Sequence, residues 1–349
     1  MSGTRTICEV IDYWGETGGS FIPAMTALAS AIRKRGERYV VISTDVPGAS
    51  WYNDLIEAGA ELRLIHDASE VAPNLKAIRP DIIHSHFTKY DVAVARSAFR
   101  SKVLWHVHST RGASSTVEEL RARVKYMVIG AGIRQWVCVS NGIASQVLER
   151  GAPKSRVRVV PNGIDTTRFR PPTASEREAA RAQFGIAETD RVILFFDRTA
   201  IKGGRVVREA LERLPGYRLL VNGGPQEDWQ SFARRYDVVL SPRLADPRPL
   251  YWAADAFVLA SFGEGFAYVL AEAAASGLPV ATSDIAPARE MVGGVDGAFM
   301  FPPGDAQALS ESISRAIDHG PSDALAERIA TFFSLDRWTS DMLSVYDAV

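Results

Sequence analysis

The chain has 349 residues, more than one hydrophobic core usually organises, so its length predicts two domains. Apolar residues form 46% of the chain and charged residues 23%, which gives each domain material for a core and excludes a disordered protein. Forty basic residues stand against 41 acidic ones. This balance argues against a nucleic-acid-binding protein, whose affinity would depend on a basic face.

Cysteine content and hydropathy predict where the protein works. Cys8 and Cys138 are too few for a disulfide framework or a four-cysteine zinc site, which favours a reducing compartment. No apolar run reaches the roughly 20 residues that a membrane span needs. The polar N-terminus leads directly into a strand-like stretch rather than a signal peptide. We therefore expect a soluble, cytoplasmic protein.

Short β-branched runs alternate with helical patterns along the first half of the chain. Apolar residues at helical spacing predict a helix over 21–35, which ends at basic residues and Gly36. The runs that predict buried strands are 7–11, 39–43, 62–65, 82–84, 103–107 and 137–140. This alternation is typical of a parallel sheet covered by helices.

A dense cluster of turn-forming residues follows at 161–172, where Pro161-Asn-Gly-Ile-Asp165 precedes a Pro-Pro pair. We expect the domain boundary there, between 165 and 166. The pattern then restarts, with helices predicted at 176–184 and 204–214 and strands at 192–196, 218–221, 238–240, 256–259 and 280–282. The sequence therefore predicts two α/β domains in tandem, with an active site in a cleft between them.

Charge is divided unevenly between the two halves. Residues 1–165 hold 21 basic and 16 acidic residues, a net of +5, whereas 166–349 hold 19 and 25, a net of −6. Eight basic and two acidic residues lie within 96–134. A solvated surface is the ordinary interpretation of such a run. The alternative is a basic patch that binds anionic lipid headgroups, in peripheral contact with the inner membrane face, or an anionic acceptor.

The most informative segment is 261–279, which combines a glycine-containing loop with an alanine-rich helix. We expect this helix to run from about residue 266 until Gly277. Its N-terminus would then present the backbone amides of Gly265, Phe266 and Ala267. Such unpaired amides, together with the helix dipole, form an anion-binding site.

Two glutamates flank that helix end. Glu264 stands in the preceding loop and Glu272 in the second helical turn, so each carboxylate can accept hydrogen bonds from hydroxyls beside a bound phosphate. The alternative is a capping group and a solvated charge. Leucine and alanines surround Glu272 in the sequence, however, and a buried glutamate needs a partner.

A second segment joins an apolar strand at 192–196 to a loop with two cations, Arg198 and Lys202, and then to Gly203-Gly204. Arginine offers a planar fork and lysine a mobile point charge, a combination that suits a diphosphate. Taken alone the pair is a weak signal, because most loop cations simply face water.

Four histidines form two His-x-His pairs at predicted strand ends, His84 with His86 and His106 with His108. Alternate residues of a strand share a face, so each pair can present both rings together. Four neighbouring imidazoles could bind zinc. The Asp-x-Asp pattern of metal-dependent nucleotide sites is absent from the sequence.

In combination these segments resemble the retaining glycosyltransferases of family 4. That family's Glu–seven residues–Glu motif corresponds to Glu264 and Glu272. The other matching stretches are Gly18-Gly19 after the first strand, Asp81-Ile-Ile-His-Ser-His86, Val160-Pro-Asn-Gly-Ile-Asp165, Trp252-Ala-Ala-Asp255 before the motif, and the last helix at 333–346. The resemblance covers essentially the whole chain.

The resemblance implies the GT-B fold, in which two Rossmann-like parallel-sheet domains face each other across a cleft and the C-terminal helix crosses back to the first. The first domain, 1–165 with 337–349, would bind the acceptor, and the second, 166–336, the nucleotide-sugar. The resemblance also implies that neither a cofactor nor a metal is needed.

It further implies roles for individual residues. Arg198 and Lys202 would hold the donor diphosphate, Glu272 the ribose hydroxyls and Glu264 the sugar, while His108 would lie at the reacting sugar. The other residues assigned to donor binding are Gly265, Phe266, Ala267, Gly18, Gly19 and Arg243. One departure is Asp197, where the family usually has glycine, because a carboxylate beside a diphosphate is unfavourable unless it turns away or pairs with Arg198.

The resemblance implies a retaining, metal-independent hexosyltransferase. It would move a sugar from a nucleotide-diphosphate sugar, most often a UDP-sugar in this family, to a hydroxyl of a glycan, glycolipid precursor or small natural product. The alternative is a non-catalytic nucleotide-sugar or glycan-binding protein on the same fold. A nicotinamide dehydrogenase is a third interpretation, but its Gly-x-Gly-x-x-Gly turn is missing; the nearest match, Gly130-Ala-Gly132, lacks the third glycine.

Overall fold

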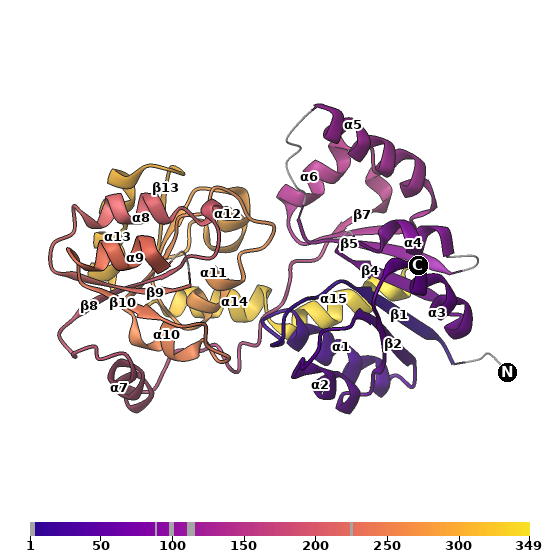
Figure 1. Cartoon of the computed structure of the whole chain (residues 1–349), viewed down its shortest axis with the longest axis horizontal. Coiled ribbons are helices and arrows are strands. Elements are labelled where there is room, and N and C mark those ends of the chain that lie inside the picture. The colour runs from indigo at the N-terminus through magenta and orange to yellow at the C-terminus, as the bar shows by residue number, and fades with distance from the viewer. Residues whose placement is uncertain (1–3, 88, 98–100, 110–115, 224–225) are drawn as a thin grey trace. The chain divides into compact units, whose positions relative to one another are not determined.

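The computed structural model describes residues 4–87, 89–97, 101–109, 116–223 and 226–349 (Figure 1). The chain divides into two compact units: the first comprises Met1–Gly163 with Leu335–Val349, and the second comprises Ile164–Ser334. The sequence places these boundaries two residues further along. Each unit is a parallel sheet with helices packed against it, which confirms the predicted α/β fold class.

The first unit contains, within the described residues, a seven-stranded sheet in the order β3-β2-β1-β4-β5-β6-β7. All neighbouring strands pair in parallel. The chain builds outward from β1 to β3 and then crosses back to β4, so the order reverses between β1 and β4. The strands are β1 (Thr6–Ile11), β2 (Arg38–Thr44), β3 (Glu61–Ile65), β4 (Ile82–His86), β5 (Lys102–Val107), β6 (Gln135–Cys138) and β7 (Val157–Val159).

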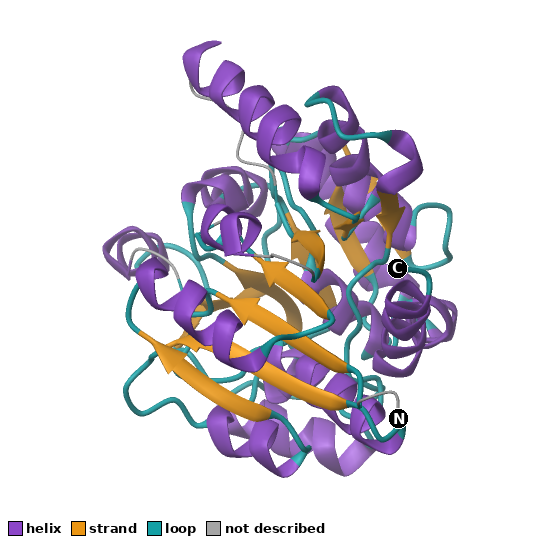
Figure 2. Ribbon diagram, turned by 90° about the vertical axis from the view of Figure 1, so that its right-hand side faces the viewer, coloured by secondary structure: helices purple, strands orange, loops and turns teal. Residues whose placement is uncertain are grey.

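The helices of the first unit connect these strands, and the last segment of the chain adds one more. They are α1 (Ile22–Lys34), α2 (Trp51–Glu57), α3 (Val71–Ile78), α4 (Asp91–Ser97), α5 (Thr116–Val124), the π-helical turn η2 (Lys125–Ile129), α6 (Asn141–Glu149) and α15 (Leu335–Asp347), with short 3₁₀ turns at Ala68–Glu70, Gly130–Gly132 and Lys154–Arg156. Figure 2 shows the strands of this unit side by side, with helices on both faces of the sheet.

One face of the first sheet carries the core that positions its polar residues. Alternate strand residues such as Ile7, Ile82 and Leu104 pack under α1 and α15. On α15, Trp338 and Tyr346 are buried in the same cluster. The C-terminal helix is therefore part of the first unit's core, as its amphipathic spacing requires.

The second unit contains a six-stranded parallel sheet among its described residues, in the order β10-β9-β8-β11-β12-β13. Here the order reverses between β8 and β11. The strands are β8 (Arg191–Phe196), β9 (Tyr217–Asn222), β10 (Val238–Ser241), β11 (Ala256–Leu259), β12 (Val280–Ser283) and β13 (Ala298–Phe301). The helices are α7 (Ala174–Gln183), the 3₁₀ turn η5 (Ala200–Lys202), α8 (Gly204–Leu211), α9 (Gln226–Ala233), α10 (Arg248–Ala253), α11 (Tyr268–Ala275), α12 (Ala286–Val292), α13 (Ala306–His319) and α14 (Asp323–Phe332).

Strand β8 shows why both faces of this sheet are covered. Val192, Leu194 and Phe196 enter one core cluster, whereas Ile193 and Phe195 enter the other. A strand that is apolar on both faces must be buried on both, which is typical of doubly wound parallel sheets. Burial of these apolar side chains on both faces favours the position of β8 in the middle of the sheet, between β9 and β11.

One strand of the second unit was missed by the sequence prediction. Strand β13 was not predicted, because its four residues, Ala298–Phe301, include no β-branched side chain and only the last is fully buried. Among the described helices, none combines the length and the apolarity that crossing a membrane requires. Both cysteines, Cys8 and Cys138, are free and buried.

Candidate active site

The two predicted segments of the second unit meet at the carboxyl ends of β8 and β11. These strands are parallel neighbours, so the loops that follow them leave the same edge of the sheet. The amide of Phe262 donates to the carbonyl of Ile201 at 2.9 Å and joins the loops directly. Gly203 has φ of +78°, and a Cβ there would lie 2.3 Å from the carbonyl oxygen of Ala260. Only glycine permits this approach, and the site lies where ligands bind in open α/β sheets.

The cation and the carboxylate of these loops are bonded to each other. Lys202 Nζ lies 2.5 Å from Glu264 Oε1, and the hydroxyl of Ser261 donates to the same oxygen at 2.6 Å. Both charged side chains are largely shielded from solvent, with 20% of Lys202 and 12% of Glu264 exposed. The structure therefore brings together two residues that the sequence assigns to diphosphate and sugar.

Glu272 is buried on α11 and has the partner that a buried carboxylate needs. The hydroxyl of Tyr251, on α10, donates to Glu272 Oε2 at 2.5 Å. Burial, and then the charge of Glu272, raises the pKa of Tyr251 well above its ordinary value, so this phenol stays protonated as a donor. Rings of Phe169 and Phe196 pack against Tyr251 and hold its position.

Arg198 belongs to the same group of side chains. Its guanidinium lies 5.9 Å from the centre of the Phe196 ring, and its charge partly opposes the rise in the pKa of Tyr251. A guanidinium has five N–H donors, so an arginine in this position can donate hydrogen bonds to more than one acceptor. Arg198, Lys202, Glu264 and Glu272 thus share one end of one sheet.

Asp197, the departure from the family pattern, turns away from this group. Its Oδ2 accepts a hydrogen bond from Trp229 Nε1 at 2.8 Å, and the side chain is buried. Burial raises its pKa above the ordinary value. A Cβ at Gly204 would lie 2.5 Å from the same oxygen, so the glycine at the start of α8 makes room for the carboxylate. The carboxylate of Asp197 therefore pairs with Trp229, which meets the condition that it turn away from the loop cations.

The start of the helix was predicted incorrectly. Helix α11 begins at Tyr268, with Ala267 as its N-cap, so Gly265, Phe266 and Ala267 lie in the loop before the helix. The amide of Tyr268 bonds to the carbonyl of Phe266, which tightens this turn. The amide of Leu270, in the first helical turn, bonds to the carbonyl of Ala267, so the anion site expected at Gly265, Phe266 and Ala267 is not formed by helix amides.

Three further residues are assigned to donor binding by the resemblance: Gly18, Gly19 and Arg243. Gly18 and Gly19 precede α1; the amide of Ile22 bonds to the carbonyl of Gly18, and Gly19 has φ of +50°. Arg243 is exposed in the loop between β10 and α10. Gly18 and Gly19 belong to the first unit and Arg243 to the second, and the donor-binding role assigned to these three residues stays a prediction.

A buried polar cluster lies in the first unit, on the sheet face covered by α1 and α15. Glu9 on β1 is opposite His84 on β4, and His86 is opposite His106 on β5. The carboxylate of Glu9 accepts from His84 Nδ1 at 3.2 Å, from His86 Nε2 at 2.5 Å and from the hydroxyl of Tyr346 at 2.6 Å. Glu9, His84 and His86 are all fully buried.

This cluster extends to His108, which follows β5. His86 Nδ1 lies 2.9 Å from His108 Nε2, so a chain of bonds runs from Glu9 through His86 to His108. Burial alone would raise the pKa of Glu9, but the charges and hydrogen bonds of His84 and His86 outweigh it and hold the pKa below its ordinary value. Burial, followed by the charge of His84, lowers the pKa of His86 to about 4. At neutral pH Glu9 is therefore ionised, and burial favours the neutral form of His86, which then holds Glu9 by its hydrogen bond rather than by charge.

These protonation states fix the hydrogens of the chain of bonds. A neutral His86 that donates from Nε2 to Glu9 must accept at Nδ1. His108 then donates from Nε2 and keeps its own Nδ1 as an acceptor. Burial, followed by the neighbouring imidazoles, also lowers the pKa of His108 well below its ordinary value. The cluster therefore presents His108 as a neutral hydrogen-bond acceptor.

The same cluster contains the geometry that could suggest a metal. His84, His86 and His106 each offer a ring nitrogen within 4.8 Å of the others. Both nitrogens of His86, however, are already bonded, to Glu9 and to His108. An ion would have to break one of these bonds. Within the described part of the chain, His106 has no hydrogen-bond partner at either nitrogen, so one buried N–H is left unsatisfied.

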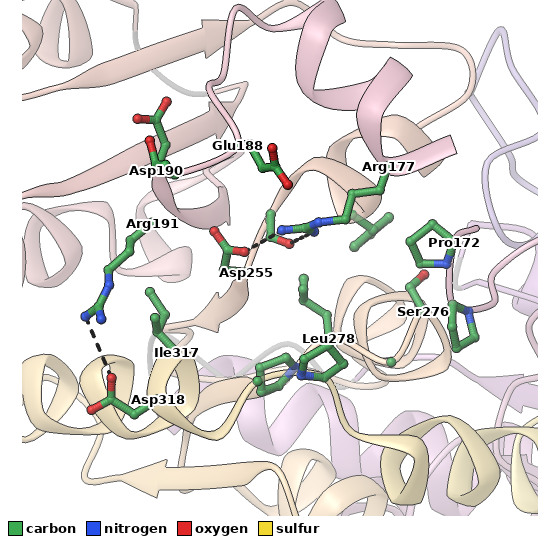
Figure 3. Close-up of a pocket in the computed structure, with 18 residues that line it drawn as sticks. Pro172, Arg177, Glu188, Asp190, Arg191, Asp255, Ser276, Leu278, Ile317 and Asp318 are labelled. Carbon is green, nitrogen blue, oxygen red and sulfur yellow. Dashed lines mark hydrogen bonds and ion pairs between the residues drawn. The ribbon is translucent and has the colours of Figure 1, made fainter. Parts of the chain in front are cut away.

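A cavity of about 590 Å³ lies at the opposite edge of the second unit's sheet, where β8, β11 and β12 begin (Figure 3). Its charged groups pair with each other: Arg177 bonds to Asp255 at 2.5 Å, and Arg191 lies 3.7 Å from Asp318. None of the predicted site residues lines it. We therefore do not assign the donor to this cavity.

Several residues of both groups were not predicted from the sequence. The sequence pattern assigns no role to Ser261, Tyr251, Glu9 or Tyr346. A glutamate within the apolar strand at 7–11 is the one local signal that could have identified Glu9, because a buried carboxylate must have partners. The others become visible only through contacts between distant segments.

The chain is similar to known proteins along most of its length. The family model described as "Glycosyl transferases group 1" matches residues 190–319, and the model described as "Glycosyltransferase Family 4" matches residues 24–168. D-inositol 3-phosphate glycosyltransferase of Corynebacterium aurimucosum is 27% identical over 272 residues, which cover 69% of this chain and 64% of that protein. The protein of the same name in Mycobacterium tuberculosis is 27% identical over 229 residues, covering 59% and 47%. The chain thus spans less than two thirds of either relative.

Solved structures share the fold over nearly the whole chain. A glycosyltransferase from Rickettsia africae has a TM-score of 0.81 at 19% identity, covering 99% of this chain and 98% of its own. HepE of Anabaena, solved in complex with UDP-glucose, has a TM-score of 0.84 at 18% identity and covers 99% and 100%. The similarity confirms the predicted arrangement of two parallel-sheet domains in one chain.

Proposed function

This chain belongs to the group 1 glycosyltransferases of family 4, and on that basis we propose that it transfers a sugar from a nucleotide-diphosphate sugar to a hydroxyl of an acceptor. The observation that carries the proposal is the meeting of Arg198, Lys202, Glu264 and Glu272 where β8 and β11 end. Cations and carboxylates at a switch point of a parallel sheet suit a ligand with both phosphates and hydroxyls.

We assign the second unit to the donor. Arg198 and Lys202 neutralise the diphosphate, which carries more negative charge as the bond to the sugar breaks. Stabilisation of that developing charge by fixed cations is the largest contribution such a site can make. Glu272, held by Tyr251, accepts hydrogen bonds from the ribose hydroxyls, and Glu264 accepts them from the sugar.

The Lys202–Glu264 ion pair has a consequence for this assignment. Its short distance means that each charge compensates the other before the donor binds. When a diphosphate approaches, Lys202 can turn to it on its flexible stem, while Ser261 continues to hold Glu264. Glu264 then no longer pairs with Lys202, and its carboxylate can accept hydrogen bonds from the sugar.

We further propose that the reaction retains the configuration of the sugar. The bond between the anomeric carbon and the diphosphate oxygen breaks, the acceptor oxygen forms its bond on the same face, and the hydroxyl proton passes to the departing diphosphate. His108 of the first unit, with Nδ1 left as an acceptor, receives a hydrogen bond from a substrate hydroxyl. No step in this scheme requires a metal.

The donor that we propose is a UDP-sugar, and the acceptor is a glycan, a glycolipid precursor or a small polyol. The complex of HepE with UDP-glucose supports the former choice, and the name of the inositol 3-phosphate enzymes supports including a cyclic polyol phosphate among acceptors tested. The alternative of a non-catalytic binding protein makes a different prediction, binding without turnover.

The decisive experiment is a screen of nucleotide-sugars by thermal shift, followed by an assay for nucleoside diphosphate release. We expect one donor to raise the melting temperature and to be hydrolysed slowly without acceptor. The Glu272→Gln variant should lose the shift, whereas Glu209→Gln, on the exposed side of α8, should keep it. Binding without any release, with or without acceptors, would favour the non-catalytic alternative.

Metal independence has its own test. EDTA should leave diphosphate release largely intact, because Arg198 and Lys202 supply the positive charge. Complete loss of activity that manganese or magnesium restores would refute this part of the proposal. It would also make the group of His84, His86 and His106 a candidate ligand set again.

A further inference from the structure

Five exposed apolar side chains follow one face of α5 and the π-helical turn η2. Among the described residues, eleven large hydrophobic side chains are exposed, and these five lie within twelve positions of one another. They are between 51% and 70% exposed: Val117, Leu120, Val124, Met127 and Val128. Their spacing of three or four residues places them in one stripe. We call these five residues the apolar stripe.

Two charged side chains beside the stripe, Glu119 of α5 and Lys125 of η2, pair with other parts of the first unit. Glu119 pairs with Arg150, at the end of α6, at 3.1 Å. Lys125 pairs with the buried Asp91 of α4 at 2.9 Å and lies 5.0 Å from the centre of the Trp105 ring. A helix on the surface of a globular protein normally has the opposite orientation, with its apolar side inward. The ion pairs therefore hold the apolar stripe outward.

Cations border the stripe on both sides. Arg121 is exposed and stands four residues after Val117 and three before Val124. Arg123, 56% exposed, stands three residues after Leu120 and four before Met127. Residues at these spacings are neighbours on a helix surface. The stripe and its borders thus combine exposed apolar side chains with positive charge.

We propose that α5 and η2 are a docking surface for a lipid bilayer with anionic headgroups. The apolar stripe enters the boundary between headgroups and acyl chains, while Arg121 and Arg123 bind the phosphates above it. The surface lies on a single helix, drawn at the outer margin of the first unit in Figure 1, and a flat interface can accept it without a groove. The sequence suggested that basic charge within 96–134 contacts the membrane. In the present proposal, the apolar stripe makes that contact together with the charge.

A second copy of the chain fits this surface less well. Two apolar stripes packed against each other would bring Arg121 and Arg123 of both copies close together, and like charges at such an interface repel. A bilayer provides the opposite charge at the depth where the arginines lie. The charge pattern therefore favours lipid over self-association.

The test uses the full-length protein and flotation with vesicles of phosphatidylcholine containing about 30% phosphatidylglycerol, compared with phosphatidylcholine alone. We expect wild-type protein to float with the anionic vesicles. The triple variant Leu120→Gln/Val124→Gln/Val128→Gln should bind at least about tenfold more weakly, because it removes much of the apolar area that would be buried. The double variant Arg121→Glu/Arg123→Glu should bind anionic vesicles more weakly than wild type. Its binding to neutral vesicles should be nearly the same as that of wild type.

The matched control is Ile56→Gln/Leu64→Gln, which removes two exposed apolar side chains elsewhere in the first unit and should float like wild type. Failure of wild-type protein to float, or equal flotation of the triple variant and the control, would overturn the proposal. A third result would also overturn it: sedimentation velocity shows that the wild-type protein is a dimer and the triple variant a monomer, and neither protein binds vesicles. Donor hydrolysis without vesicles should be the same in all variants, so this outcome is separate from that of the proposed transferase.

Discussion

Each unit places an acidic residue on or after a strand at the switch point of its sheet, but the two residues have different partners. In the first unit, Glu9 lies beside the switch between β1 and β4, buried under α1 and α15 and bonded to imidazoles and a phenol. In the second, Glu264 stands in the loop after β11 and pairs with Lys202. One carboxylate is held by imidazoles and a phenol, and the other by an ammonium group and a hydroxyl.

This difference separates two kinds of behaviour. The bonds of Glu9 depend on which histidines are neutral, so the first unit should respond to pH. Lys202 and Glu264 form a direct ion pair, and both side chains are partly accessible to a ligand. The second unit should therefore respond to the donor, and the first to protons.

The largest effect should come from removing the cation of the second unit. Lys202→Ala should lower the rate constant of transfer by about a hundredfold to a thousandfold, because the departing diphosphate loses a fixed positive charge. Steady-state kinetics with the identified donor measures this effect. The matched control is Arg205→Ala, since Arg205 pairs with Glu209 on the exposed face of α8. Equal losses in both variants would mean that Lys202 has no special place in the reaction.

The pH dependence of stability tests the first unit. The unfolded chain takes up a proton at His86 near pH 6.5, whereas the folded protein resists it until about pH 4. Lowering the pH between these values therefore favours unfolding, by a free energy on the order of 3 kcal/mol at most. The contribution is fully present above pH 6.5 and is lost as the pH falls. Chemical denaturation at several pH values measures it.

The variant His86→Gln should flatten that pH dependence, because it removes the titrating group. Its stability at pH 7 should also fall, since Glu9 loses a donor, so the slope and not the absolute stability is the informative quantity. The exposed His66 provides the control, and His66→Gln should keep the wild-type slope. An unchanged slope in His86→Gln would show that the cluster does not control the response to pH.

Much of the fold could be predicted because it depends on local pattern. Alternation of apolar strands with amphipathic helices indicated two parallel sheets, and both are present. Strand β13 escaped because Ala298–Phe301 is short and mostly half-buried, so its pairing with β12 supplies what its residue types do not. The start of α11 was misplaced by two residues because the backbone at Ala267 leaves helical geometry.

The site could be predicted only in part, for a different reason. Lys202 and Glu264 follow neighbouring strands, so strand order brings them together as their motifs indicated. Partners that depend on packing between distant segments leave no local signal. Tyr346 bonds to Glu9 across 337 positions of the chain, and Trp229 binds Asp197 from a separate helix. The orientation of α5 is likewise set by Arg150 and Asp91, which its own sequence does not reveal.

We expect an intermediate loss of donor affinity when the charge of Glu272, the buried carboxylate of the second unit, is removed. Glu272→Gln keeps the shape of the side chain but removes its charge, so hydrogen bonds to a ribose should weaken by about 1.5–3 kcal/mol. Calorimetric titration with the nucleoside diphosphate should show the dissociation constant rise by about tenfold to a hundredfold. An unchanged constant would mean that the ribose is bound elsewhere, and the distinction between a donor-responsive and a proton-responsive unit would lose its main support.

The smallest effect concerns the phenol that holds this carboxylate, and it sharpens the comparison with Tyr346 in the first unit. Tyr251→Phe removes the hydrogen bond to Glu272 at 2.5 Å without changing the packing against Phe196. A buried hydrogen bond to a charged group contributes about 1.5–3 kcal/mol, but the charge of Arg198 remains nearby, so we expect a loss of donor affinity of only about fivefold to tenfold. The rate constant of transfer at saturating donor should change little, because Tyr251 positions Glu272 and does not contact the departing diphosphate.

The control for this variant is Tyr217→Phe, because the hydroxyl of Tyr217 contacts the exposed Arg191 at 3.3 Å. If Tyr251→Phe lowered the rate constant as strongly as Lys202→Ala, the phenol would have to act on the reacting atoms, and its role as a positioning residue would be wrong.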